Sequence, residues 1–203
     1  MGKVVYGLKN VHYAIYDNTT KEYGQWKPIP GSVSLSADAD SSQNDFYADD
    51  VVYATIAATS KETGSIEFAA ITDEMYTDLF GYYVDSVNGM YMKPTEPVNV
   101  SVALGYEISG NIHKQRGLRY NVTFTDPSQS ANSMTDSTNP DTVTANYTAI
   151  GRDFEITTGT GQDAVTETKN ILKAHCDNSG QTHVSYDNFW NAVIEPGKAS
   201  TSA

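Results

Sequence analysis

Apolar and polar residues alternate along much of the chain, which is the pattern of a β-strand with one buried face. The clearest case is segment 98–108, where large apolar side chains occupy every second position. Segment 118–124 repeats the pattern, so the two are expected to pair as a hairpin through a loop near 111–117, with these residues on one face: Leu118, Tyr120, Val122 and Phe124. Segment 143–149 is a third such strand. Weaker strand candidates are 4–16, 32–37, 49–55, 65–71, 154–158 and 170–176.

Shorter signals predict one tight turn and two helices. Asn88-Gly89 separates two apolar runs and is the usual sequence of a two-residue type I′ turn. Thr72 can cap a helix that ends at Gly81, with two acidic residues in its positive first turn. A second helix is expected from near Ser185 to before Pro196, because aromatic residues there recur at helical spacing.

Three stretches are too polar to be buried, namely 37–45, 126–141 and 159–163. We expect the first two to be long exposed loops that become ordered against a partner, since long loops in a compact domain tend to be functional. The polar end of the chain, 198–203, is expected to be a flexible tail.

The length of 203 residues suits one domain over 1–203, and 39% hydrophobic residues are enough for one packed core. Together with the alternation, this predicts an all-β fold, mainly an antiparallel β-sandwich or barrel, with a short flanking α-helix. The beginning of the chain has no signal-peptide pattern, and nowhere do about 18 apolar residues run together. We therefore expect synthesis in the cytoplasm and no membrane partner.

The formal net charge is −12, from 25 acidic and 13 basic residues. Proteins that bind nucleic acid by neutralising phosphates carry clustered lysines and arginines, so this balance argues against that class. The one basic cluster is Lys114, Arg116 and Arg119. Three charges are too few for a nucleic-acid face, and a solvated hairpin end or an ion pair with acidic loops of another subunit is expected instead.

Motifs of catalysis are missing from the sequence. It has no nucleotide-binding, metalloprotease or serine-hydrolase signature, its four histidines are scattered, and its one cysteine, Cys176, is expected to be a buried structural thiol. Calcium-binding loops need alternating acidic residues, then a glycine and a glutamate, and only the first part occurs in the acidic cluster Asp38, Asp40, Asp45, Asp49 and Asp50. We expect no catalytic residue, cofactor or metal, and a protein that is not an enzyme.

Several strings resemble one family. Residues 6–14 (YGLKNVHYA), 29–35 (IPGSVSL) and 46–53 (FYADDVVY) look like the opening third of major tail proteins from siphophages of Gram-positive bacteria, in order and spacing. Residues 64–68 (GSIEF), followed by the first predicted helix, are similar to that family's next strand and flanking helix. The resemblance covers roughly residues 3–125.

This resemblance implies a phage tail-tube fold and a virion protein. Such proteins form hexameric rings that stack into a tube, join other tail proteins (tape measure, tail terminator and distal tail), and let DNA pass through the lumen without specific binding. Acidic groups lining the bore would repel phosphates over about 8 Å at physiological salt. Candidate ring or inter-ring contacts are Asp38, Asp40, Asp45, Asp49, Asp50, Lys114, Arg116 and Arg119.

An alternative is a monomeric carbohydrate-binding or ligand-binding β-sandwich. It is suggested by the 14 tyrosines and the acidic loops. Its candidate aromatic residues are Tyr82, Tyr83 and Tyr91, although tyrosines on a hairpin more often pack or form interfaces.

Overall fold

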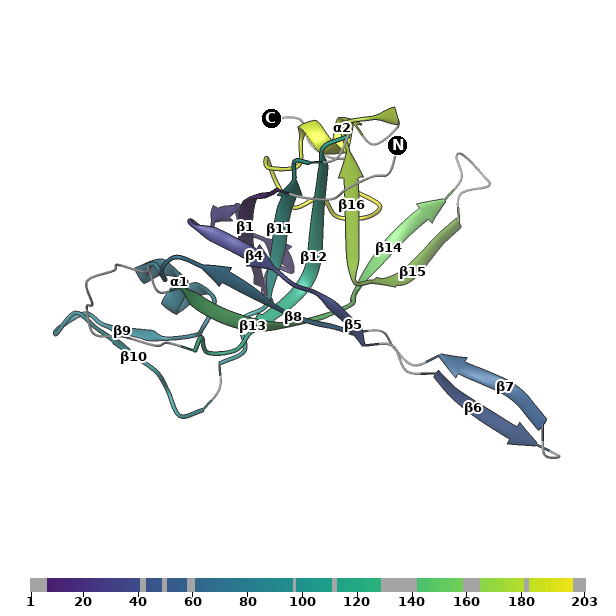
Figure 1. Ribbon diagram of the computed structural model, residues 1–203, viewed down its shortest axis with the longest axis horizontal. Helices are drawn as coiled ribbons and strands as arrows, with labels where there is room; N and C mark the ends of the chain where they lie inside the picture. The colour runs from purple at the N-terminus through teal and green to yellow at the C-terminus, as the bar shows by residue number, and fades with distance from the viewer. Residues whose placement is uncertain are drawn as a thin grey trace, which may run out of the picture.

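Antiparallel strands make up most of the structure, a computed structural model (Figure 1). It describes residues 7–40, 43–48, 51–57, 61–96, 98–110, 113–128, 142–158, 165–180 and 183–198. The only helices in these ranges are two short ones, α1 (Asp73–Asp78) and α2 (His183–Asp187). The predicted all-β class with a short helix is therefore confirmed.

One ten-stranded sheet forms the body. Its path runs β2-β1-β11-β12-β13-β8-β4, and β3, β5 and β16 pair with β1, β8 and β12 respectively. The bounds of these strands are β1 (Leu8–Asp17), β2 (Glu22–Tyr23), β3 (Lys27–Pro28), β4 (Ser32–Leu35), β5 (Asp38–Asp40), β8 (Lys61–Phe68), β11 (Val102–Ile108), β12 (Gln115–Phe124), β13 (Val143–Ile150) and β16 (Lys173–Asp177).

Three two-stranded ribbons extend from this body. They are β6 (Gln43–Ala48) with β7 (Val51–Ala57), β9 (Tyr83–Asp85) with β10 (Met90–Met92), and β14 (Arg152–Thr158) with β15 (Val165–Ile171). Figure 1 shows the first at the right, the second at the left and the third at the upper right.

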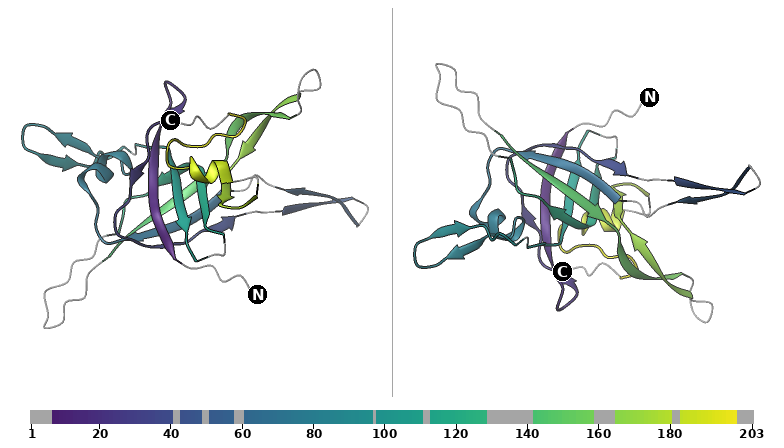
Figure 2. Two further views of the ribbon diagram at one scale, coloured as in Figure 1. Left: turned by 90° about the horizontal axis from the view of Figure 1, so that it is seen from above. Right: turned by 90° about the horizontal axis from the view of Figure 1, so that it is seen from below.

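The sheet changes direction along β12, because the two halves of this strand pair with different neighbours. Its first half, up to Arg119, pairs with β16, and its second half, from Asn121, pairs with β13. The strands β13 and β8 consequently cross below β1, β11 and β12 (Figures 1 and 2). A central core fills the space between these two groups of strands and α1, and its largest side chains include Tyr13, Phe68, Phe80, Phe124 and Tyr147.

A second cluster, the outer core, lies on the other side of β1, β11 and β12. It is covered by the C-terminal strap, which we define as residues 183–198, and contains Leu118, Tyr120, Phe154, Tyr186 and Phe189. Because both faces of β11 are covered, Ala103 is as fully buried as Leu104.

The expectation that four residues of β12 share one face is wrong. Val102 lies opposite Val122, whereas Leu104 lies opposite Arg119, so β12 contains one extra residue, a β-bulge. A bulge reverses the alternation beyond it. Leu118 and Tyr120 accordingly enter the outer core, and Val122 and Phe124 enter the central core.

The predicted hairpin of β11 and β12 and the strand β13 are confirmed, with β11 beginning at Val102 and not at 98. The predicted loop at 37–45 is wrong, because Asp38–Asp40 forms β5 against β8 and β6 begins at Gln43. These residues are polar because β5 lies at a sheet edge with exposed side chains. Of the loop at 126–141, residues 129–141 lie outside the described part, as do 159–163 and the tail from 199.

The turn at Asn88-Gly89 is also different from its prediction. Asp85 pairs with Met90, so the loop has four residues, and only Gly89 has a positive φ there. The carboxylate of Asp85 accepts hydrogen bonds from the Val87 amide (2.9 Å) and the Asn88 side chain (2.6 Å), and its carbonyl accepts one from Gly89. These bonds favour the longer loop over the type I′ turn.

Both helices are shorter than predicted. Thr72 stands at the N-cap of α1 without a side-chain capping bond, and Gly81 follows with φ +66°. The second helix ends at Asp187, and turns carry the chain onward to Pro196.

Candidate assembly surfaces

One face of the sheet is uncovered and carries mainly polar and charged side chains. Alternate residues of β8 and β13 point into the central core, and those between them point outward. Figure 2 (right) shows β8 and β13 in front, with no described element over them. We call this the polar sheet face, and its outward residues are Ser34, Ser36, Asp38, Asp40, Lys61, Thr63, Ser65, Glu67, Thr144, Asn146, Thr148 and, at the end of β13, the apolar Ile150.

Hydrogen bonds across the strands order this face. Ser36 and Ser65 are joined by their hydroxyls (2.9 Å), and the Glu67 carboxylate accepts bonds from Thr142 (2.6 Å) and Ser34 (3.0 Å). These two bonds lower the pKa of Glu67 below its usual value, so the carboxylate stays charged at neutral pH.

The charges of the polar sheet face are mainly acidic. Its one basic residue, Lys61, lies 3.1 Å from Asp40, which leaves Asp38 and Glu67 without a cation on this face. A face of this composition presents hydroxyl and amide groups and a small negative charge. Its one cation, Lys61, is paired with Asp40, so the face carries no cluster of cations of the kind that holds phosphates.

The acidic residues singled out in the sequence do not form one cluster in the described part. Asp38 and Asp40 lie on the polar sheet face. Asp45 belongs to β6, but its side chain is outside the described part, as are Asp49 and Asp50 altogether. Their role as ring contacts stays a prediction.

The basic cluster is distributed over three environments. Lys114 is exposed, Arg116 is partly buried beside Glu107, and Arg119 is buried at 4% exposure. The expected solvated hairpin end is therefore wrong for Arg119, because β12 directs its side chain inward.

Arg119 takes part in an ionic triad where β12 changes partner, with Glu62 and Arg119 buried and Lys173 exposed. Its guanidinium donates to Glu62 of β8, and Lys173 of β16 donates to the other oxygen of the same carboxylate at 2.8 Å. The guanidinium also lies over the rings of Tyr106 and Tyr147, with 5.1 and 5.8 Å to their centroids. Sequence reasoning missed Glu62, because nothing around it distinguishes it from an exposed acid.

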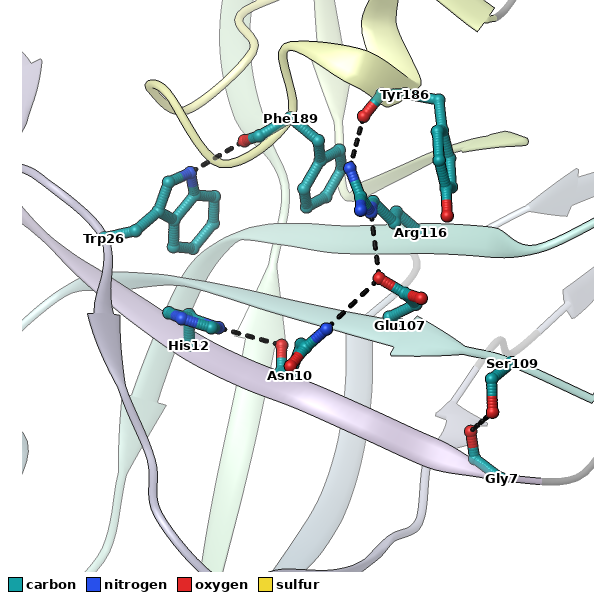
Figure 3. A network of polar contacts seen from close by, with 9 residues as sticks. All are labelled: Gly7, Asn10, His12, Trp26, Glu107, Ser109, Arg116, Tyr186 and Phe189. Carbon is teal, nitrogen blue, oxygen red and sulfur yellow. Dashed lines mark hydrogen bonds and ion pairs between the residues drawn. The ribbon is translucent and has the colours of Figure 1, made fainter. Parts of the chain in front are cut away.

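A second polar network fastens the C-terminal strap to the sheet (Figure 3). Glu107 accepts hydrogen bonds from Arg116 (3.0 Å) and from Asn10 (3.3 Å). Arg116 also donates to the carbonyl of Tyr186 and lies over its ring at 3.9 Å. The strap is thus held through its main chain as well as its apolar side chains.

Asn10, at the other end of this network, occupies a bulge in β1. Lys9 lies opposite Glu107 and His12 opposite Gly105, so β1 has one extra residue there, and Asn10 has φ +49°. The Asn10 carbonyl is close to Nδ1 of His12 at 2.9 Å. The extra residue interrupts the regular pairing of β1 with β11 beside Glu107.

The ribbon of β9 and β10 is unusually apolar for an exposed element. Five of its side chains are large, apolar and at least 47% exposed, and Val87 at the tip reaches 88%: Tyr83, Val84, Val87, Met90 and Met92. Large apolar side chains gathered on one exposed element mark an interaction surface. We call this element the apolar ribbon.

The tyrosines proposed for a ligand groove serve different purposes. Tyr82 and Tyr91 are half-buried and pack against Tyr76 of α1, with ring centroids 5.1 and 5.5 Å away. Only Tyr83 is exposed. The aromatic cluster therefore anchors the apolar ribbon to α1.

A cavity of about 550 Å³ lies at the base of the ribbon of β14 and β15, and its lining includes Tyr16, Tyr23 and Arg152. Arg152 covers the ring of Tyr16 at 3.3 Å, and the hydroxyl of Tyr23 donates to the carbonyl of Tyr120. The Tyr16 face that could stack on a sugar is consequently occupied.

Within the described ranges, no group of three or more histidine, cysteine or acidic side chains could hold a metal ion. Neither described helix has the length and apolar character needed to cross a membrane. No protein-family model and no curated protein matches this chain.

Proposed function

We propose that the protein is a structural subunit that assembles into stacked hexameric rings, and that these form the tail tube through which a bacteriophage passes its DNA. The observation that carries this proposal is the polar sheet face. It is a wide, ordered strand surface that bears hydroxyl, amide and acidic groups and leaves no unpaired cation for phosphate.

This face has the chemistry that a DNA conduit needs. Duplex DNA is densely negative, and proteins hold it mainly through lysine and arginine contacts to phosphates. Asp38 and Glu67, which have no cation on this face, repel phosphates over about 8 Å at physiological salt. DNA beside this face moves without being held.

The sheet edge next to this face supports ring formation. Strand β5 pairs with β8 on one side and with no described strand on the other. An unpaired edge favours pairing with another chain, and a head-to-tail contact generates a ring when its rotation closes. At the other end of the sheet path the edge strand is β2, which has only two residues, so the two edges are not equivalent.

The three ribbons support assembly independently. A two-stranded ribbon is marginally stable in water when nothing packs on it. The ribbon of β6 and β7 projects far from the body in Figure 1, and all of β15 except Ile171 is exposed. Contacts with neighbouring copies would stabilise such elements.

On this proposal the protein is part of the virion. Its partners are further copies of the chain, the tape measure, tail terminator and distal tail proteins, and the passing DNA. The resemblance of residues 3–125 to siphophage major tail proteins supports these partners.

The alternative, a monomeric ligand-binding module, depends on the cavity beside Arg152. Sedimentation velocity over a hundredfold range of concentration, with negative-stain microscopy of the most concentrated sample, separates the two. Rings or tubes at high concentration support the proposal. A protein that stays monomeric throughout and binds a soluble saccharide contradicts it.

A further inference from the structure

The apolar ribbon has an ordered tip. The hydrogen bonds of Asp85 fix the loop that carries Val87, and Tyr91 holds the ribbon to α1. Lys93 fixes its base by donating to the carbonyl of Phe80 (2.7 Å) and to Asp126 (2.6 Å). An ordered apolar projection loses little conformational entropy when it binds, which favours insertion into a partner.

The same chain has an apolar hollow of about 210 Å³ between the C-terminal strap and the sheet. We call it the strap pocket. Residues of the outer core line it, chiefly Leu118, Tyr120, Ala174, Phe189 and Ile194. Its size suits one or two aliphatic side chains.

The ribbon and the strap pocket lie on different parts of the molecule. Figure 1 shows β9 and β10 at the left end, and β16 and α2 at the top. A projection and a matching hollow on separate surfaces of one chain make a head-to-tail contact between copies, and such contacts build rings or filaments.

We propose that the tip of the apolar ribbon of one copy inserts Val87 into the strap pocket of a second copy. This inference rests on the proposed self-assembly and names one contact by which it occurs. Copies of net charge −12 repel one another. An apolar contact overcomes this repulsion most easily when salt screens it, so assembly strengthens as the salt concentration rises.

Two substitutions in the same loop test the contact. Val87→Asp places a charge on the inserting side chain, whereas Ser86→Asp adds the same charge to an exposed neighbour and leaves Val87 in place. We expect V87D to raise the concentration needed for assembly at least tenfold, and S86D to change it less than threefold. Equal effects of the two variants contradict the inference.

Cross-linking tests the geometry directly. Ser185 lines the strap pocket, so chains carrying V87C and chains carrying S185C are mixed and treated with a short bismaleimide. Cys176 also lines the pocket and is kept, and a mixture of V87C with wild-type chains controls for reaction at Cys176. We expect a link between positions 87 and 185 of different chains. Wild-type rings or tubes without this link, together with normal assembly of V87D, overturn the inference and leave the proposed function standing. A wild-type chain that never assembles overturns both.

Discussion

Glu62 of β8 and Arg119 of β12 form an ion pair in which both side chains are almost completely buried, at 2% and 5% exposure. The pair lies where β12 leaves β16 and joins β13, and Lys173 supplies a second cation from β16. Three strands that diverge at this point are therefore joined by one carboxylate. The stability of the body should depend strongly on it.

Replacing Glu62 by glutamine should destabilise the fold severely. The change leaves the Arg119 guanidinium buried without a counter-charge, and breaking a buried pair in this way typically costs about 3–5 kcal/mol. Urea unfolding followed by tryptophan fluorescence measures the loss. Glu67→Gln on the same strand is the control, and its midpoint should stay near that of the wild type. Similar midpoints for both variants would show that the triad adds little.

The same carboxylate predicts an acid dependence of stability. Burial by itself raises the pKa of Glu62, but the hydrogen bonds from Lys173 and Arg119 outweigh it and hold the pKa below the ordinary carboxyl value of 4.5. The folded state therefore binds this proton less readily than the unfolded chain. Its contribution is fully present above about pH 4.5 and is lost as the pH falls through the lowered pKa. Unfolding free energies between pH 7 and 3 should fall more steeply for the wild type than for E62Q.

The bulge at Asn10 gives a conformational prediction. Left-handed backbone costs an ordinary L-residue about 1–2 kcal/mol, and glycine has no such cost. Asn10→Ala and Asn10→Gly both lose the hydrogen bond to Glu107. The difference between their unfolding free energies therefore measures the cost of the left-handed backbone conformation. We expect N10A to be less stable than N10G by about 1 kcal/mol in thermal and urea unfolding. The opposite order would mean that the positive φ is not maintained in solution.

The polar sheet face predicts how charge controls contact with DNA. Thr63→Lys with Asn146→Lys adds two cations to this face, while Thr166→Lys with Thr168→Lys adds the same charge to β15. Each phosphate neutralised on duplex DNA contributes about −0.9 to the slope of log affinity against log salt. In assembled protein, we expect only the first pair to retain DNA added during assembly, and its retention should weaken steeply with salt. Equal retention by the two pairs would show that the polar sheet face does not line the bore.

Sequence reasoning predicted the strands better than the faces they present. The alternation in 102–108 and 118–124 identified the hairpin, because most of its apolar positions are buried against one of the two cores. The bulge in β12 could not be predicted from the alternation. Both faces of this strand are covered by a core, so an apolar side chain is buried whichever face it points to. The type I′ turn predicted at Asn88-Gly89 is wrong because Asp85 supplies hydrogen bonds that favour a longer loop.

The candidate surfaces were predictable only in part. The acidic residues Asp38 and Asp40 were identified, but their place on a sheet edge depends on pairing with β8 across more than twenty residues. Glu62 and Arg119 are separated by 57 residues, and local sequence carries no sign of such a pair. The exposed side chains of the apolar ribbon became recognisable only once its neighbours were known.

Cryo-electron microscopy of the concentrated wild-type protein tests the central proposal most directly. We predict end-on views of six-fold rings with an open centre, stacked into tubes, with β4, β5, β8 and β13 lining the channel through the polar sheet face. Separate protomers at every concentration and salt condition, or tubes whose channel is lined by other elements, would contradict it.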